Sequence, residues 1–142
     1  TWSPSSISYT GNNRTHMIRV PDDGRFELRL MDGSSNPYLL QAGVIAAGLH
    51  GMNNNINPGK PLSCNMYTDH KNYPDLKKLP NTIEDALNQL ENSKEIRKAF
   101  GDDTINSYLK LKKSEIENFY QKEKFDKKTP VTNWEKNSTL DC

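Results

Sequence analysis

Two stretches near the start of the chain decide the fold: Asn13-Arg14-Thr15-His16-Met17-Ile18-Arg19-Val20-Pro21 and Gly24-Arg25-Phe26-Glu27-Leu28-Arg29. In the second stretch charged residues occupy alternate positions, at Arg25, Glu27 and Arg29. Because successive side chains of a strand point to opposite faces, this alternation predicts one charged and one apolar face. The sequence therefore predicts a hairpin with strands over 15–20 and 25–30 and a turn over 21–24.

The charged face has two interpretations from the residues alone. Arginine grips phosphate or carboxylate in a planar, bidentate manner, and a carboxylate between two arginines could hold a divalent metal that carries a phosphate. The other interpretation is a solvated strand face, on which ion pairs contribute little to stability. The spacing by itself favours the solvated face.

The register of the hairpin decides whether Arg19 joins this face. Direct pairing across the turn would put Arg19 on the apolar side. A loop with an odd number of residues, or a bulge at Gly24, would bring Arg19 beside Arg25 and Glu27. We predict an odd loop. Arg14 has the opposite parity to Arg19, so it needs a further bend or must act from the entrance of the strand.

The composition describes a small chain with little apolar material. It has 142 residues, so we expect one domain or part of one. The hydrophobic content is 33% and the mean hydropathy is −0.89, which is low for an autonomous core. Apolar residues are dense over 26–52 and sparse after 101. We therefore expect residues outside this chain to complete its core.

Charge and cysteine content exclude several classes of protein. A net charge of +1 gives no overall field that would recruit nucleic acid or a membrane. The sequence holds no signal peptide and no run of 18 or more apolar residues. Cys64 and Cys142 lack metal-ligand spacing, and two cysteines do not make a disulfide framework. We expect a cytoplasmic protein with reduced thiols.

The rest of the chain predicts helices around one long loop. Within 36–52, Asn36 as N-cap and Pro37 as first residue begin a helix that runs to His50, and Gly51 suits the position just after its end. It is apolar nearly all round and is therefore expected to be buried. Residues 53–80 predict a long irregular loop. Helices then follow over 81–142, beginning near Thr82, near Ser93, at 102 and at 129–130.

The longest of these helices is expected over 102–123. Its expected inner face consists of Ile105, Tyr108, Leu109, Ile116, Phe119 and Tyr120. The predicted fold class is α+β, with a small antiparallel sheet and about five helices. Four segments make up the expected organisation: strands with the arginine and glutamate motif (1–35), a buried helix (36–52), a long loop (53–80) and a helical tail (81–142).

These motifs resemble the C-terminal part of the glutamine synthetase catalytic domain. The segments that carry the resemblance are Asn13-Arg14-Thr15, Ile18-Arg19-Val20-Pro21, Arg25-Phe26-Glu27-Leu28-Arg29, Asp32-Gly33-Ser34-Ser35-Asn36-Pro37-Tyr38-Leu39 and Ala46-Ala47-Gly48-Leu49-His50-Gly51. The resemblance is dense over 12–52 and looser to Glu135. The Asp32-Gly33-Ser34 form and both chain ends look closest to the branch that includes γ-glutamylmethylamide synthetases.

The resemblance implies roles for the charged face. The family phosphorylates the γ-carboxylate of glutamate with ATP, and an amine then displaces the phosphate. By position in the motif, Arg14 would stabilise the transferring phosphoryl group, and Arg19 and Arg25 would grip the ATP phosphates. Glu27 would bind Mg²⁺ or Mn²⁺, and Arg29 would hold the substrate carboxylate. The implied full-length parent is a ring-shaped homo-oligomer that takes glutamate and ammonia.

Several alternatives stay open at this point. The amine acceptor could be methylamine instead of ammonia, and the chain could be a non-catalytic binding or assembly module. Because Glu27 is the single candidate metal ligand, we expect the chain to be inactive by itself. Tyr67 aligns with a tyrosine that some bacterial members adenylylate, although an exposed loop tyrosine is the favoured interpretation. His16 is expected to be a packing residue or to lie behind the site.

Overall fold

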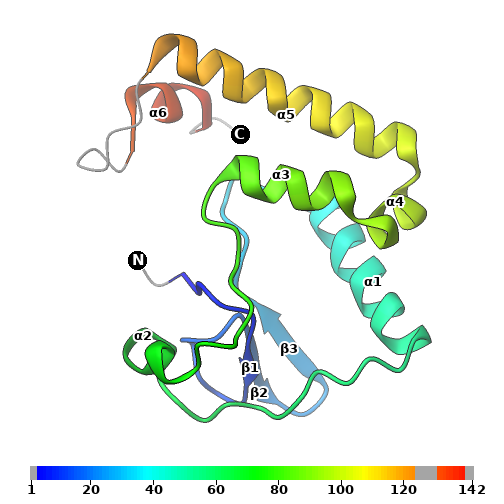
Figure 1. Ribbon diagram of the computed structural model, residues 1–142, viewed down its shortest axis with the longest axis vertical. Coiled ribbons are helices and arrows are strands. Elements are labelled where there is room, and N and C mark those ends of the chain that lie inside the picture. Colours follow the sequence, from blue (N-terminus) through cyan, green and yellow to red (C-terminus); the bar gives the residue numbers. More distant parts are fainter. Residues whose placement is uncertain (1–2, 124–130, 140–142) are drawn as a thin grey trace. The chain divides into compact units, whose positions relative to one another are not determined.

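The computed structural model describes residues 3–123 and 131–139. It has the expected α+β fold class, and it divides into two compact units (Figure 1). Unit 1 consists of Thr1–Asp32 and Gly51–Ala86, and unit 2 consists of Gly33–His50 and Leu87–Cys142. The sheet belongs to unit 1, whereas most of the helical residues belong to unit 2.

Unit 1 is built on a three-stranded sheet in the order β1-β2-β3. The strands are β1 (Tyr9–Thr10), β2 (Ile18–Asp22) and β3 (Arg25–Leu28). β2 and β3 form the predicted antiparallel hairpin, but β1 pairs with β2 in parallel. The expectation of a purely antiparallel sheet was therefore wrong. A two-residue strand in a polar segment carries no alternation that the sequence could reveal.

The hairpin contains a bulge that corrects the predicted turn. Arg19 lies opposite Glu27 and Asp22 lies opposite Arg25, with a register shift between the two pairs. Two residues of β2, Val20 and Pro21, therefore face one residue of β3. The loop is the even pair Asp23-Gly24, so the predicted odd loop was wrong, and the bulge lies in β2 and not at Gly24.

The long segment 53–80 is less irregular than expected. It contains a short helix, α2 (Met66–Asp69), and a 3₁₀ turn, η1 (His70–Asn72). Its end runs beside the start of the chain, because the N–H of Ile7 donates to the carbonyl of Lys77 at 2.8 Å. The N–H of Leu79 likewise donates to Ser5 at 3.1 Å. These bonds fix the segment that leads into β1.

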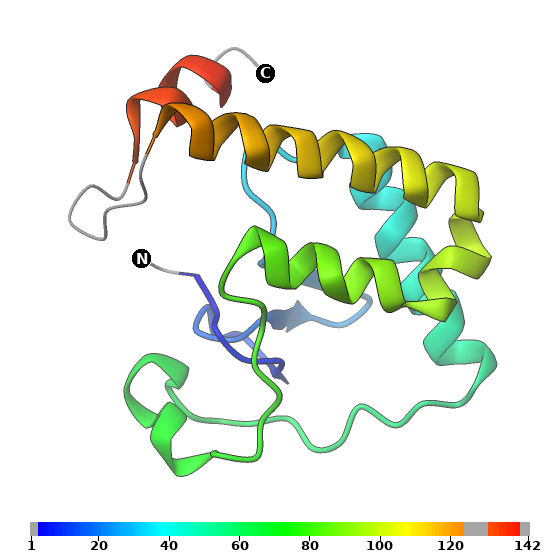
Figure 2. The same ribbon diagram turned by 45° about the horizontal axis from the view of Figure 1, so that its top comes forward.

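Unit 2 has a small core between its helices. The helices are α3 (Ile83–Asn92), α4 (Lys94–Phe100) and α5 (Asp102–Lys122) (Figure 2). Leu87 of α3 packs with Ile105 and Leu109 of α5, and further apolar side chains surround them. Ile105 and Leu109 were correctly predicted to face inward. Tyr120 was not, because 56% of its surface is exposed.

Helix α1 (Pro37–Asn53) begins as predicted and is not buried as predicted. The side-chain oxygen of Asn36 accepts from the N–H groups of Tyr38 at 3.0 Å and Leu39 at 3.1 Å, which is an N-cap. The helix continues past Gly51 to its end, so Gly51 is not a C-terminal cap. None of its residues is buried in this chain, and Tyr38 is 83% exposed.

The last described helix is α6 (Asn133–Thr139). Thr132 and Glu135 form a capping box: the Thr132 hydroxyl accepts from the N–H of Glu135, and the Glu135 carboxylate accepts from the N–H of Thr132 at 2.7 Å. The expected start at 129–130 lies outside the described residues. Within those residues, none of the helices combines the length and apolar character needed to cross a bilayer.

Candidate active site

An ion pair between neighbouring strands lies at the centre of the candidate site. Nη1 of Arg19 donates to Oε1 of Glu27 at 2.7 Å. Arg19 is buried, with 8% of its surface exposed, whereas 39% of the Glu27 side chain is accessible. The bulge at Val20-Pro21 makes this contact possible, because a regular ladder from the same turn would set Arg19 opposite Leu28. The shared charged face therefore exists for these two residues.

Asn12, which sequence reasoning did not single out, completes the contacts of Arg19. Its side-chain oxygen accepts from Nε of Arg19 at 3.0 Å and also from Nη2. Asn12 follows shortly after β1, which pairs with β2 so that Thr10 lies opposite Arg19. The signal in the sequence is weak, since an asparagine in a Gly-Asn-Asn run is equally typical of a turn. The missing information was the existence of β1.

Arg14 and Arg25 also act on Glu27. The hydrogen bond from Arg19 is the main cause that lowers the pKa of the Glu27 carboxyl below its usual 4.5. The charges of Arg19, Arg25 and Arg14 lower this pKa further, while partial desolvation opposes them. Three of the predicted arginines thus lie close enough to stabilise the ionised carboxylate. Arg25 itself forms an exposed ion pair with Asp22 at 3.2 Å.

Arg29 lies just beyond the end of β3. Its N–H donates to the carbonyl of Met17 at 2.9 Å, so the backbone still follows the hairpin. The side chain is partly buried. The structure therefore places Arg29 in the same hairpin, two residues beyond Glu27.

A network of buried polar groups holds the segment that carries Arg14. His16 is fully buried, and its ring nitrogens contact the Ser8 hydroxyl at 3.0 Å and the Cys64 carbonyl at 2.9 Å. This is the packing role expected for His16. The amide of Asn13 donates to the same carbonyl at 2.9 Å. The loop before β2 is thus tied to the segment before α2.

Tyr67 contacts the segment that carries Arg14. It lies in α2, and its hydroxyl donates to the backbone carbonyl of Arg14 over 3.5 Å, a long hydrogen bond. The side chain is half-buried. The expectation of an exposed tyrosine in an irregular loop is therefore corrected: Tyr67 contacts the backbone that carries Arg14.

Glu27 fits a divalent metal as one ligand among several. Its ionised, accessible carboxylate offers the hard oxygen donor that Mg²⁺ and Mn²⁺ prefer. Over residues 3–123 and 131–139, no three side chains of His, Cys, Asp or Glu gather into a possible metal site. Further side-chain ligands of these four types for a metal at Glu27 would come from outside the described residues.

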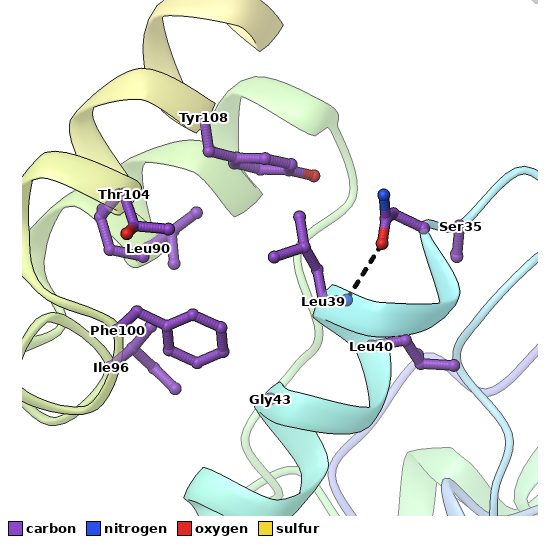
Figure 3. A pocket seen from close by; sticks show the side chains of 11 residues that line it. Ser35, Leu39, Leu40, Gly43, Leu90, Ile96, Phe100, Thr104 and Tyr108 are labelled. Atoms are coloured by element: carbon purple, nitrogen blue, oxygen red, sulfur yellow. Dashed lines mark hydrogen bonds between the residues drawn. The ribbon is translucent and has the colours of Figure 1, made fainter.

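A separate hollow lies in unit 2 and has a different character (Figure 3). It has a volume of about 310 Å³ and lies between the start of α1 and helices α3, α4 and α5. Leu39 points toward Tyr108, Leu90 and Phe100 across it. Its lining is mostly apolar and includes no charged side chain. It therefore offers no side-chain charge to a phosphate.

Comparisons with known proteins agree on one family. The family model described as glutamine synthetase, catalytic domain, matches residues 1–136. A glutamine synthetase from Rhizobium meliloti (strain 1021) is 45% identical over 141 residues, which is 99% of this chain. A glutamate–methylamine ligase from Methyloversatilis universalis is 41% identical over 144 residues, again 99% of the chain.

A solved structure shares the fold of the chain. The complex of GmaS with ADP, in its first conformation, superposes with a TM-score of 0.80 at 40% identity and covers 99% of this chain. This chain spans 31% of the length of the Rhizobium relative, 30% of the Methyloversatilis relative and 30% of the GmaS chain. It corresponds to less than a third of each of these proteins.

Proposed function

The chain belongs to the glutamine synthetase family, as part of its catalytic domain, and we propose that it supplies the phosphate-binding side of an ATP-dependent ligase that joins glutamate to an amine. The observation that carries this proposal is the ion pair between buried Arg19 and the accessible carboxylate of Glu27, whose pKa is lowered first by Arg19 and then also by the charges of Arg25 and Arg14. Phosphoryl transfer needs positioned positive charge more than covalent chemistry, and this cluster supplies it.

Each charged residue has a proposed role. Arg14 lies before β2, in the segment held by His16, and would stabilise the phosphoryl group as it moves from ATP to the γ-carboxylate of glutamate. Arg25 at the exposed start of β3 would bind the ATP phosphates together with the N–H donors that Arg19 still has. Arg29 would hold the substrate carboxylate in its planar fork.

Glu27 would provide one oxygen to Mg²⁺ or Mn²⁺. When bound, the cation would neutralise charge on the ATP phosphates. The lowered pKa of the carboxyl keeps Glu27 in the anionic form that such a ligand requires. The remaining ligands would come from the rest of the catalytic domain, so the chain alone would be inactive. The full-length parent would be a cytoplasmic homo-oligomeric ring, as the family resemblance implies.

Two acceptors compete for the second step. The Rhizobium relative is a glutamine synthetase and the Methyloversatilis relative is a glutamate–methylamine ligase, at similar identities. No described side chain distinguishes ammonia from methylamine, since the charged cluster faces the phosphates in either reaction. We retain ammonia as the first candidate and methylamine as the second. A non-catalytic module is disfavoured, because a module without phosphate chemistry has no need of an arginine buried against an accessible carboxylate.

The test is ADP release by the full-length protein that contains this chain. It is given Mg²⁺, ATP and glutamate with either ammonium or methylamine, and the preferred amine identifies the ligase. Glu27→Gln should reduce kcat by about a hundredfold or more. Glu117→Gln, an exposed position on α5, is the matched control and should retain activity. No amine-dependent ADP release with either amine would support the non-catalytic module.

A further inference from the structure

A line of three side chains crosses the whole sheet of unit 1. Asn12 follows β1, Arg19 lies in the central strand β2, and Glu27 lies in the edge strand β3. Arg19 contacts the other two at once, with Asn12 on one side and Glu27 on the other. Both contacts depend on strand pairing, because Thr10 and Glu27 each lie opposite Arg19.

The two partners divide the guanidinium group of Arg19 between them. The side-chain oxygen of Asn12 accepts hydrogen bonds from Nε and Nη2, and Oε1 of Glu27 accepts one from Nη1. A guanidinium carries five N–H donors, so these three hydrogen bonds leave two donors on the Nη atoms. Because Arg19 is anchored at three nitrogens and buried, its plane is fixed before any ligand arrives.

This division sets which edge of the guanidinium faces Glu27. An arginine next to a carboxylate prefers the bidentate fork, in which two nitrogens bind both carboxylate oxygens. Such a fork between Arg19 and Glu27 would use both oxygens of Glu27 and two nitrogens of Arg19. Asn12 takes the Nε–Nη2 edge of the guanidinium, so Glu27 meets the Nη1–Nη2 edge, where it accepts one hydrogen bond, from Nη1 to Oε1.

We propose that Asn12 is a positioning residue that holds the guanidinium of Arg19 in the orientation in which it gives Glu27 a single hydrogen bond. Glu27 then retains Oε2 for a divalent cation, and Arg19 retains N–H donors for a nucleotide phosphate. This inference rests on the proposed function. Asn12 itself touches neither ligand, and it is exposed, so its side chain contributes a hydrogen-bond acceptor and little packing.

The test uses the full-length protein and two readouts. Binding of Mn²⁺ alone is measured by electron paramagnetic resonance, and KM for ATP and for glutamate is measured with kcat. Asn12→Ala should weaken Mn²⁺ binding and raise KM for ATP by about tenfold or more, as residues behind a metal ligand do. KM for glutamate should change less than threefold. Asn12→Asp retains the acceptor oxygen and should restore both values to within threefold of the wild type.

Asn106→Ala is the matched control. Asn106 also accepts from an arginine that is paired to a carboxylate, since Arg97 donates to it at 3.1 Å and to Asp102 at 2.7 Å. This cluster lies in unit 2, so the variant should leave Mn²⁺ binding and KM for ATP unchanged. Unaltered Mn²⁺ affinity in Asn12→Ala would overturn the inference about Asn12.

Two further outcomes are separable. If Asn12→Ala does not fold, Asn12→Asp decides by itself, because a tenfold loss of Mn²⁺ affinity there would contradict a role that needs only the acceptor. If the wild type binds Mn²⁺ but releases no ADP with either amine, the proposed function fails. The Mn²⁺ comparison between Asn12→Ala and Asn12→Asp still tests the geometry in that case.

Discussion

At the scale of single residues, the site depends on unequal burial of two opposite charges. Arg19 is almost fully enclosed, whereas the Glu27 carboxylate stays accessible at the surface of the sheet. An enclosed guanidinium held by two partners cannot move away, so the accessible carboxylate is the adaptable member of the pair. A ligand that arrives from solvent therefore meets Glu27 in an orientation that Arg19 has already set.

The ionisation of Glu27 should make stability depend on pH. The pKa of its carboxyl is lower in the folded protein than the usual 4.5, mainly through Arg19. Its stabilising contribution is therefore complete above the unfolded pKa and is lost as pH falls through the folded pKa. In metal-free full-length protein, Glu27→Gln should lower the melting temperature at pH 6, and this difference should shrink below about pH 4.

Glu117→Gln is the control for this titration, and it should melt like the wild type at both pH values. The effect of Glu27→Gln should be small, because the carboxylate is accessible and water screens its charge. A difference in melting temperature that stays constant from pH 6 to pH 3.5 would show that the amide acts through something other than lost charge.

At the scale of elements, the hairpin shows what the sequence could reveal. The alternation of Arg25, Glu27 and Arg29 correctly predicted a strand, which ends at Leu28, two residues before the predicted end. An odd loop was predicted, with a bulge at Gly24 as the alternative, whereas the loop is even and the bulge lies at Val20-Pro21. The physical reason is that proline has no N–H for a ladder hydrogen bond, and a bulge accommodates this defect. Pro21 and Gly24 therefore indicated that the hairpin is irregular, but they did not indicate where its bulge lies.

Gly24 should be required for its backbone conformation alone. Its φ of +80° lies in the region that side chains disfavour, and a Cβ placed there would meet nothing within 4 Å. Gly24→Ala should therefore destabilise the protein by about 1 kcal/mol through strain, without a steric clash. The measurement is the melting temperature of the full-length protein, with Gly33→Ala as control.

Gly33 is equally open to an added Cβ and has no positive φ. The control variant should thus be neutral or slightly stabilising. Equal losses in the two variants would mean that the tight turn at Asp23-Gly24 tolerates a side chain, and that the register of the hairpin does not depend on glycine.

At the scale of the whole molecule, the chain has more apolar surface than it buries. Among the described residues the buried apolar set is Met66, Leu87, Ile105 and Leu109. Helix α1 contributes none of these, although it is apolar nearly all round. The sequence correctly gave the helix and its N-cap, because both are local. It could not show what covers the helix, since burial depends on residues that are distant or in other parts of a protein.

The relatives are about three times longer than this chain. We therefore expect the exposed side of α1 to be covered in the full-length protein. Ile45 is 61% exposed in this chain. Ile45→Gln in the full-length protein should therefore lose about 2 kcal/mol of stability. The measurement is thermal unfolding, with Gln41→Ala on the same helix as control. If both variants melt like the wild type, α1 is exposed to solvent in the complete protein as well.

The bulge at Val20-Pro21 has a consequence for how this hairpin can change in length. It holds one residue more than a regular ladder needs between Arg19 and the turn. Loss of a single residue there would straighten β2 and still leave Arg19 opposite Glu27. Insertion of a single residue cannot be accommodated by removing the bulge, so it would require a larger loop. The hairpin can therefore lose one residue at the bulge without changing the pairing of Arg19 with Glu27.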